Sequence, residues 1–233
     1  MLLGDDCGKK YDPFIIFKSA PAKPTAKQSE NNARRHGFGE PTWREICRLQ
    51  RQFPCQIYGN KTAWWNADIS MKFLEFHFAN RENLGDKILL LWDDLSAHWT
   101  QEVKLYAKSL NVVLLKVPPR YTSACHPADI SWNKPFKGLL RRLWSLVGPS
   151  RPIMTDWITS SWGALSEKTI RSGFARVGLL LDTREAAVDE NVEVNTENLI
   201  ACLENYNLAE AEVNSDDDIE TNSSGSHSED DDL

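Results

Sequence analysis

The most regular hydrophobic pattern in the chain is an apolar run that ends abruptly in carboxylates. Residues 88–91 are all isoleucine or leucine, Trp92 follows, and Asp93 and Asp94 come next. Such a run predicts a strand that is buried on both faces and presents carboxylates at its C-terminal end. That end of a strand is where α/β sheets usually carry their chemistry.

A second carboxylate, Asp129, is predicted to lie near the first one. Residues 99–110 have the pattern of a helix and residues 112–116 that of a second apolar strand, which together complete a βαβ unit. Residues 118–137 are rich in proline and polar residues, which indicates a loop that enters a helix after Asp129. Two carboxylates from separate elements suit a hard metal ion. Ordinary strand-end turns and helix N-caps contain the same residue types.

The first forty residues combine a short apolar pattern with a long polar one. Residues 1–17 predict a β-hairpin whose turn lies at residues 6–9. Residues 19–41 are polar and basic with prolines and glycines near each end, so they are expected to form a loop.

Helical periodicity accounts for much of the remaining sequence. A short helix is predicted over residues 42–52, where Thr42 and Glu45 could form a capping box. A firmer helix begins after a cap at Asn66 or Asp68 and runs through residue 80. Further helices are predicted over residues 130–147, 152–165 and 167–177.

Charge divides the chain into two parts. The net charge of the 233 residues is −6, but residues 1–181 hold 26 basic against 16 acidic residues, whereas residues 182–233 hold one arginine against 17 acidic residues. A basic body favours a partner that carries phosphates. The acidic remainder has too few apolar residues to bury and is expected to be a disordered tail. We therefore predict one domain over residues 1–181 and a tail over residues 182–233.

The cysteines and the longest apolar runs exclude several classes of protein. Five cysteines without a C-x-x-C pair support neither a zinc ribbon nor a disulfide framework. No run of about 18 apolar residues predicts a membrane span, and the N-terminus lacks the apolar stretch of a signal peptide. These features predict an intracellular protein with no membrane partner.

The carboxylate segments follow the motifs of a known family. An apolar strand ends in Asp93-Asp94 with His98 four residues after Asp94, and the following loop and helix hold Pro118, Pro119, Thr122, Ser123, His126, Pro127, Asp129, Pro135, Phe136 and Lys137 in order. This series resembles the DDE superfamily endonuclease domain of pogo/Tigger-type transposases and of their jerky-like and centromere-protein-B-like relatives. The family has D-N-x-x-x-H and P-P-x-x-T-S-x-x-Q-P-x-D at these places. Asp94 replaces its asparagine and His126 its glutamine.

The resemblance implies a fold and a chemistry. The fold is a three-layer α/β RNase H-like domain, and the hairpin over residues 1–17 resembles the family hairpin that follows the strand with the first catalytic aspartate. That strand is not found in this chain, so an N-terminally truncated fold is expected. Asp93 and Asp129 would be catalytic residues and ligands of Mg²⁺ or Mn²⁺ in cleavage of phosphodiester bonds by two metal ions.

Other residues near these carboxylates have accessory roles by the same resemblance. Asp94, His98 and His126 would lie beside the metal ligands. The expected partner is DNA and the expected location the nucleus, with self-association as a further expectation. The alternatives are a non-catalytic DNA-binding or protein-interaction module and a nuclease of another class on the same fold. Phosphate contacts are expected from the basic residues of the helix after Asp129, namely Lys134, Lys137, Arg141 and Arg142.

Overall fold

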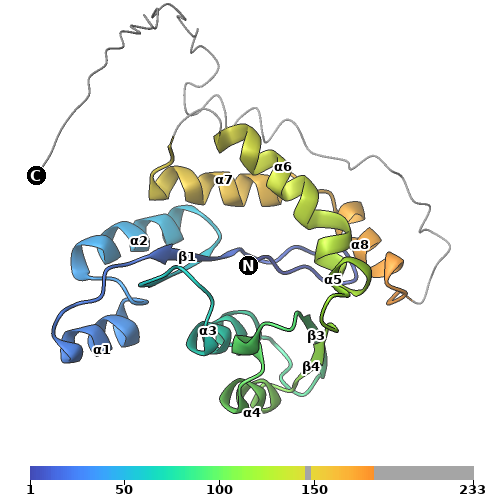
Figure 1. The fold of residues 1–233 in the computed structure, drawn as a ribbon, viewed down its shortest axis with the longest axis horizontal. Helices are drawn as coiled ribbons and strands as arrows, with labels where there is room; N and C mark the ends of the chain where they lie inside the picture. The colour runs from blue at the N-terminus through green and yellow to red at the C-terminus, as the bar shows by residue number, and fades with distance from the viewer. Residues whose placement is uncertain (145–147, 181–233) are drawn as a thin grey trace, which may run out of the picture.

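The computed structural model describes residues 1–144 and 148–180 and has a mixed α/β architecture (Figure 1). The strands are β1 (Phe14–Lys18), β2 (Gln56–Asn60), β3 (Ile88–Trp92) and β4 (Val112–Lys116). The helices are α1 (Thr25–Arg34), α2 (Glu40–Gln52), α3 (Ala67–Phe78), α4 (Gln101–Ser109), α5 (Thr122–Cys125), α6 (Asn133–Trp144), α7 (Arg151–Gly163) and α8 (Glu167–Arg176), with short helical turns η1 (Ser96–His98) and η2 (Ala128–Trp132).

The chain opens with the predicted hairpin. Gly4 and Lys10 form an antiparallel bridge, and the amide of Asp5 donates a hydrogen bond to the carbonyl of Lys9 across the turn. Gly8 has a φ of +93°, a conformation that glycine adopts without strain. The hairpin is therefore confirmed over residues 1–14, with a turn that begins at Asp5, one residue earlier than predicted, whereas residues 14–17 of the predicted hairpin belong to a strand that pairs elsewhere.

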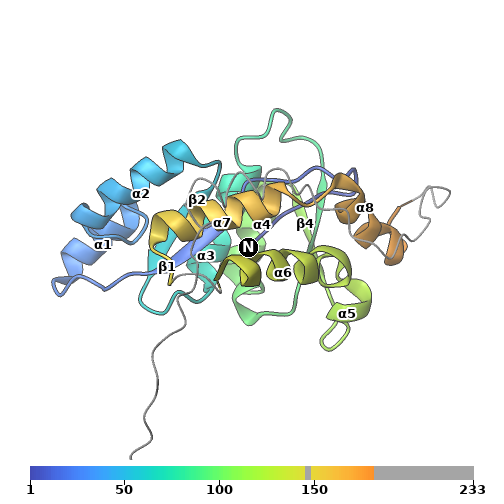
Figure 2. The same cartoon turned by 90° about the horizontal axis from the view of Figure 1, so that it is seen from above.

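Strands β1 and β2 form a parallel pair that is covered on both faces. The register aligns Phe14 with Gln56. One face packs against α2 and α7 through Ile15, Phe17 and Ile57, and Figure 2 shows α7 crossing over the pair. The other face packs against α3. The sequence analysis missed β2, because its residues include a glycine and two amides and lack a long apolar run.

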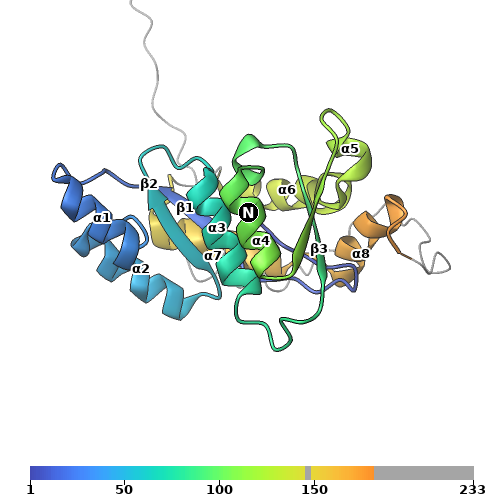
Figure 3. The same cartoon turned by 90° about the horizontal axis from the view of Figure 1, so that it is seen from below.

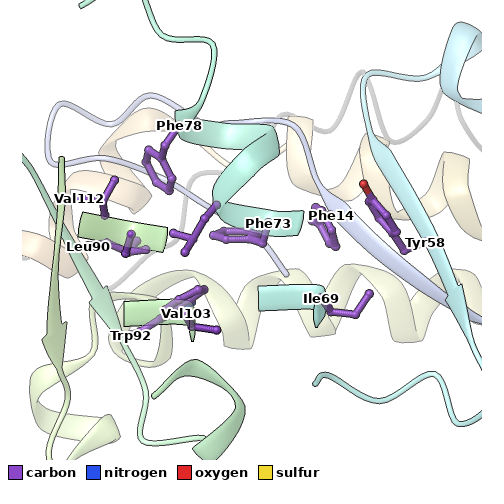
Figure 4. Packing of buried hydrophobic residues seen from close by; sticks show 11 residues of the cluster. Phe14, Tyr58, Ile69, Phe73, Phe78, Leu90, Trp92, Val103 and Val112 are labelled. Atoms are coloured by element: carbon purple, nitrogen blue, oxygen red, sulfur yellow. The ribbon is translucent and has the colours of Figure 1, made fainter. Parts of the chain in front are cut away.

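Strands β3 and β4 are also parallel, as the predicted βαβ unit requires. Leu90, Trp92 and Val112 pack against α3 and α4 in a core that Phe14 and Tyr58 of the first pair also enter (Figure 4). The opposite face is open: Leu89, Val113 and Leu115 are 53%, 49% and 45% exposed. The prediction that β3 is buried on both faces is wrong, because the described residues supply no layer over that side.

The predicted loop over residues 19–41 is wrong as well, since it contains α1. This helix has no apolar stripe, and its stability comes from polar contacts such as Gln28 Nε2 to Asn32 Oδ1 at 2.7 Å and Arg35 Nη1 to Asn31 Oδ1 at 2.8 Å. Hydrophobic periodicity gives no signal for such a helix.

The capping of the next two helices can be compared with the prediction. Helix α2 begins at Glu40 after Gly39 and has no side-chain cap, so the predicted capping box is wrong. The cap of α3 is confirmed at Asn66, whose side chain accepts a hydrogen bond from the amide of Ile69.

The C-terminal helices form a second core around tryptophans. Trp132, Trp157 and Trp162 are buried in it, and Trp162 Nε1 donates to the carbonyl of Tyr11 in the hairpin. Residues 145–147 of the predicted helix and the predicted tail over residues 182–233 lie outside the described residues. Among the described helices, none combines the length and apolar character that a bilayer span needs.

Candidate active site

Asp93 lies directly after β3, and neighbouring groups fix its backbone and side chain. Its carbonyl accepts a hydrogen bond from Trp99 Nε1 at 2.8 Å, and its Oδ1 accepts one from the amide of Leu95 at 3.2 Å. The side chain is 42% exposed. Asp93 is therefore a positioned carboxylate that solvent can reach.

His98 is buried beside this carboxylate. Its ring stacks on Trp92 with 4.0 Å between ring centroids and 10° between the planes. Its Nε2 lies 3.3 Å from Asp93 Oδ1, and its Nδ1 lies 3.0 Å from Ser70 Oγ. His98 thus faces the carboxylate with one nitrogen and the interior with the other, and it does not face solvent.

The surroundings keep Asp93 ionised. The pKa of its carboxyl lies below its usual range, first because of the His98 ring nitrogen, while partial burial acts in the opposite direction. The amide of Leu95 and the charge of His126 lower it further. An aspartate in this state can act as a ligand for a cation at neutral pH.

Asp129 lies in η2, a single π-type turn, and its contacts are to side chains. Its Oδ1 accepts a hydrogen bond from Asn133 Nδ2 at 2.7 Å, and its Oδ2 lies 3.0 Å from His126 Nδ1. Neither oxygen caps a helix, which removes the ordinary N-cap explanation for this residue. Such π-type turns are rare in proteins as a whole, and those that occur are frequently at functional sites.

The segments that carry the two carboxylates leave the same edge of the second sheet. Because β3 and β4 are parallel, the segments with Asp93 and Asp129 both start at carboxyl ends of strands (Figure 3). His126, which contacts Asp129, is close enough to Asp93 to lower its pKa. Asp94 is exposed, and no contact joins it to this group within the described residues.

The donor atoms suit a hard divalent ion, but they are few. The described residues contain one group of three ligand atoms within 4.8 Å of one another, made by Asp5, Asp6 and Cys7, and neither Asp93 nor Asp129 belongs to it. The Asp5 oxygens serve the hairpin turn and Tyr11. Carboxylates are the right ligands for Mg²⁺ or Mn²⁺, and this edge offers two of them.

Three of the four basic residues of α6 lie on the side of the helix that faces away from the core. Leu139 and Leu143 are buried on the inner side. Positions 134, 137 and 141 follow the i, i+3, i+7 spacing of one helical stripe. Because α6 begins directly after η2, the stripe starts next to Asp129. All four predicted basic residues are exposed: Lys134, Lys137, Arg141 and Arg142.

Sequence reasoning missed three residues that contact Asp93 or the polar network behind it. Ser70 and Trp65 come from α3 and the loop before it, and Trp99 precedes α4. Ser70 is a polar residue on the buried face of α3, three and four positions before Phe73 and Leu74, and this placement is the signal that could have indicated a buried partner.

Comparison with known proteins identifies the family. The family model described as "DDE superfamily endonuclease" matches residues 5–147 of this chain. These residues include Asp93, Asp129 and the whole of α6. The chain belongs to the DDE superfamily of endonucleases. A human protein described as "Pogo transposable element with KRAB domain" is 22% identical to this DDE chain over 186 residues. The match covers 72% of the chain and 27% of that relative, and no solved structure matches.

Proposed function

We propose that this DDE chain is a transposase-derived domain with an RNase H-like fold that binds DNA in the nucleus and brings a phosphodiester to the edge formed by Asp93 and Asp129. The observation that supports this most is that the segments with Asp93 and Asp129 both leave the carboxyl-terminal edge of the parallel β3–β4 pair, and that the basic stripe of α6 starts next to Asp129. DDE family membership is consistent with it.

Each residue has a distinct part in this proposal. Asp93 and Asp129 would hold Mg²⁺ or Mn²⁺, and such an ion supplies a positive charge that binds and polarises a phosphate oxygen. Asp93 Oδ2 faces no protein donor among the described contacts, so it remains free to bind a cation. His126 restrains Asp129, and the exposed cations of α6 neutralise phosphates and orient the strand.

The DNA interface can be tested by reversing charge on α6. Lys137→Glu combined with Arg141→Glu should lower affinity for duplex DNA at least tenfold in fluorescence anisotropy. The slope of log affinity against log salt concentration should also become less negative by about 2, because each lost phosphate contact contributes about 0.9 to that slope. The matched control reverses Lys104 and Lys108, two exposed lysines of α4. An equal loss of DNA affinity in the α6 and α4 double variants would contradict a specific DNA interface on α6.

A second candidate function is a non-catalytic interaction module. The open face of β3–β4 favours it, because Leu89, Val113 and Leu115 form an apolar surface. We propose that a second copy of the chain covers this face. Sedimentation velocity should then show a dimer that Leu89→Lys abolishes, and a monomer at all concentrations would exclude it.

A further inference from the structure

Ser70 is a fully buried hydroxyl at the centre of a small polar network. It lies in α3, and its Oγ accepts a hydrogen bond from Trp65 Nε1 at 2.9 Å. The same oxygen lies 3.0 Å from His98 Nδ1, 2.9 Å from the carbonyl oxygen of Ala97 and 3.3 Å from that of Asn66. A serine hydroxyl has one proton, so it donates fully to only one of these three.

The choice decides the tautomer of His98. If the hydroxyl donates to the carbonyl of Ala97 or of Asn66, His98 Nδ1 must carry the ring proton to bond Ser70 Oγ, and the Nε2 lone pair then faces the ionised Asp93. If the hydroxyl donates to Nδ1, Nε2 carries the proton and points it at Asp93 Oδ1, 3.3 Å away. Nε2 is shielded from solvent and forms no hydrogen bond of normal geometry within the described residues, so Asp93 Oδ1 is the acceptor nearest to its proton.

Electrostatics favours the second arrangement. A lone pair turned towards a carboxylate in a buried place is repulsive, whereas a hydrogen bond to an ionised acceptor is roughly twice as strong as one between neutral groups. The donors then run in one direction, from Trp65 through Ser70 and His98 to Asp93. Hydrogen bonds arranged in such a series polarise and strengthen one another.

We infer that Ser70 is a positioning residue for Asp93, acting through the tautomer of His98. Stacking on Trp92 fixes the plane of the imidazole but does not determine which nitrogen carries the proton. The hydroxyl of Ser70, which accepts a hydrogen bond from Trp65, determines the protonated nitrogen. The Nε2–H of His98 then points at Asp93 Oδ1. Together with the amide of Leu95 this holds Oδ1 and leaves Oδ2 for a cation. The metal-binding consequence rests on the proposed function, and the tautomer itself does not.

The tautomer can be measured directly in the full chain without metal. In ¹⁵N-histidine-labelled protein at neutral pH, long-range correlations between ring nitrogens and ring protons identify the protonated nitrogen, and His98→Gln assigns the signal. We expect His98 to carry its proton on Nε2. In Ser70→Ala, Nδ1 loses its donor, and the signal should change to a mixture or to the Nδ1-protonated form. The affinity of the Asp93 site for Mn²⁺ should then fall about 10- to 100-fold.

Ser161→Ala is the matched control, because Ser161 is another fully buried helical serine and its Oγ has no hydrogen-bond partner within the described residues. This variant should leave both the tautomer and Mn²⁺ affinity as in the unaltered chain. An unaltered chain with the proton on Nδ1, or a Ser70→Ala protein with unchanged spectrum and affinity, would overturn the inference. Absence of Mn²⁺ binding that depends on Asp93 would instead count against the proposed function, and the metal-free spectrum would still decide the role of Ser70.

Discussion

Two histidines near the first core show how a buried imidazole depends on its neighbours. His98 has Ser70 and Asp93 beside its two nitrogens. His77 in α3 lies among aromatic rings instead, with centroids of Phe73 and Phe76 at 4.5 and 4.7 Å. Its Nε2 has no hydrogen-bond partner within the described residues, and burial lowers its pKa to about 4.

His77 should therefore make the fold sensitive to acid. An unfolded histidine takes up a proton near pH 6.5 and the folded one near pH 4, so stability is complete above pH 6.5 and falls as the pH approaches 4. The loss reaches on the order of 3 kcal/mol. In His77→Phe, urea unfolding at pH 7 and pH 5 should give a smaller difference than in the unaltered chain. If the free energy of unfolding depends equally on pH in the two proteins, groups other than His77 cause the sensitivity to acid.

The carboxylates of the candidate site lead to a prediction about catalysis. With two aspartates at the edge, a pair of metal ions has too few protein ligands, so we expect the chain as printed not to cleave DNA. Supercoiled plasmid incubated with Mg²⁺ or Mn²⁺ should stay intact, as with Asp93→Ala and Asp129→Ala. Nicking by the unaltered chain that both variants abolish would contradict this and would direct attention to Asp5 and Asp6.

At the scale of whole elements, one lysine joins the hairpin to α7. Lys10 Nζ donates hydrogen bonds to the carbonyls of Trp162 at 3.1 Å and Gly163 at 2.6 Å, and also to that of Leu165. Trp162 and Gly163 lie at the C-terminal end of α7, where carbonyls have no partners within the helix, and Leu165 lies just beyond that end. Lys10 therefore caps α7 and attaches it to the N-terminal part of the chain.

Replacing this lysine should loosen the attachment. Lys10→Met keeps the length of the side chain but removes the donors, and we expect the free energy of unfolding to fall by about 2 kcal/mol or more. The control is Lys61→Met at an exposed position, which should change stability by less than about 0.5 kcal/mol. Chemical denaturation of both variants measures this difference. Similar values for the two would show that the capping contacts contribute little.

The elements also show what a single sequence can predict. β3, β4, α3, α7 and α8 were found because each has an apolar run or stripe that packs against a core. Helix α1 and strand β2 were missed because polar contacts and tertiary pairing hold them, and these leave no periodic signal. The motifs made Asp93 and Asp129 candidates, and their role as site residues stays a prediction, whereas Ser70 became visible only when folding placed it against His98.

At the scale of the whole molecule, the separation of charge should control binding to DNA. Residues 1–181 have 26 basic and 16 acidic residues, whereas the complete chain has a net charge of −6. The acidic residues after position 181 are tethered to the basic body and so compete with phosphates at high effective concentration. Deletion of residues 182–233 should raise affinity for duplex DNA whatever its sequence.

This deletion is tested by anisotropy at low and moderate salt. The shortened chain should bind more tightly, and its advantage should shrink as salt screens both charged partners. A peptide of residues 182–233 added in trans should compete with DNA only at high concentration. Equal DNA affinities of the complete and shortened chains would contradict competition by residues 182–233. Binding that does not respond to salt would contradict an electrostatic interaction between residues 1–181 and DNA.

The open face of β3–β4 also affects how the chain reaches its folded state. Each strand of this two-stranded sheet has a backbone edge that no other described strand pairs with, beside the exposed side chains of Leu89 and Val113. The rate of folding is first-order in protein, whereas the rate at which two such edges join is second-order. Dilution therefore favours folding over aggregation. The yield of soluble protein on refolding should therefore fall as protein concentration rises, and a lysine at position 113 should make that yield nearly independent of concentration.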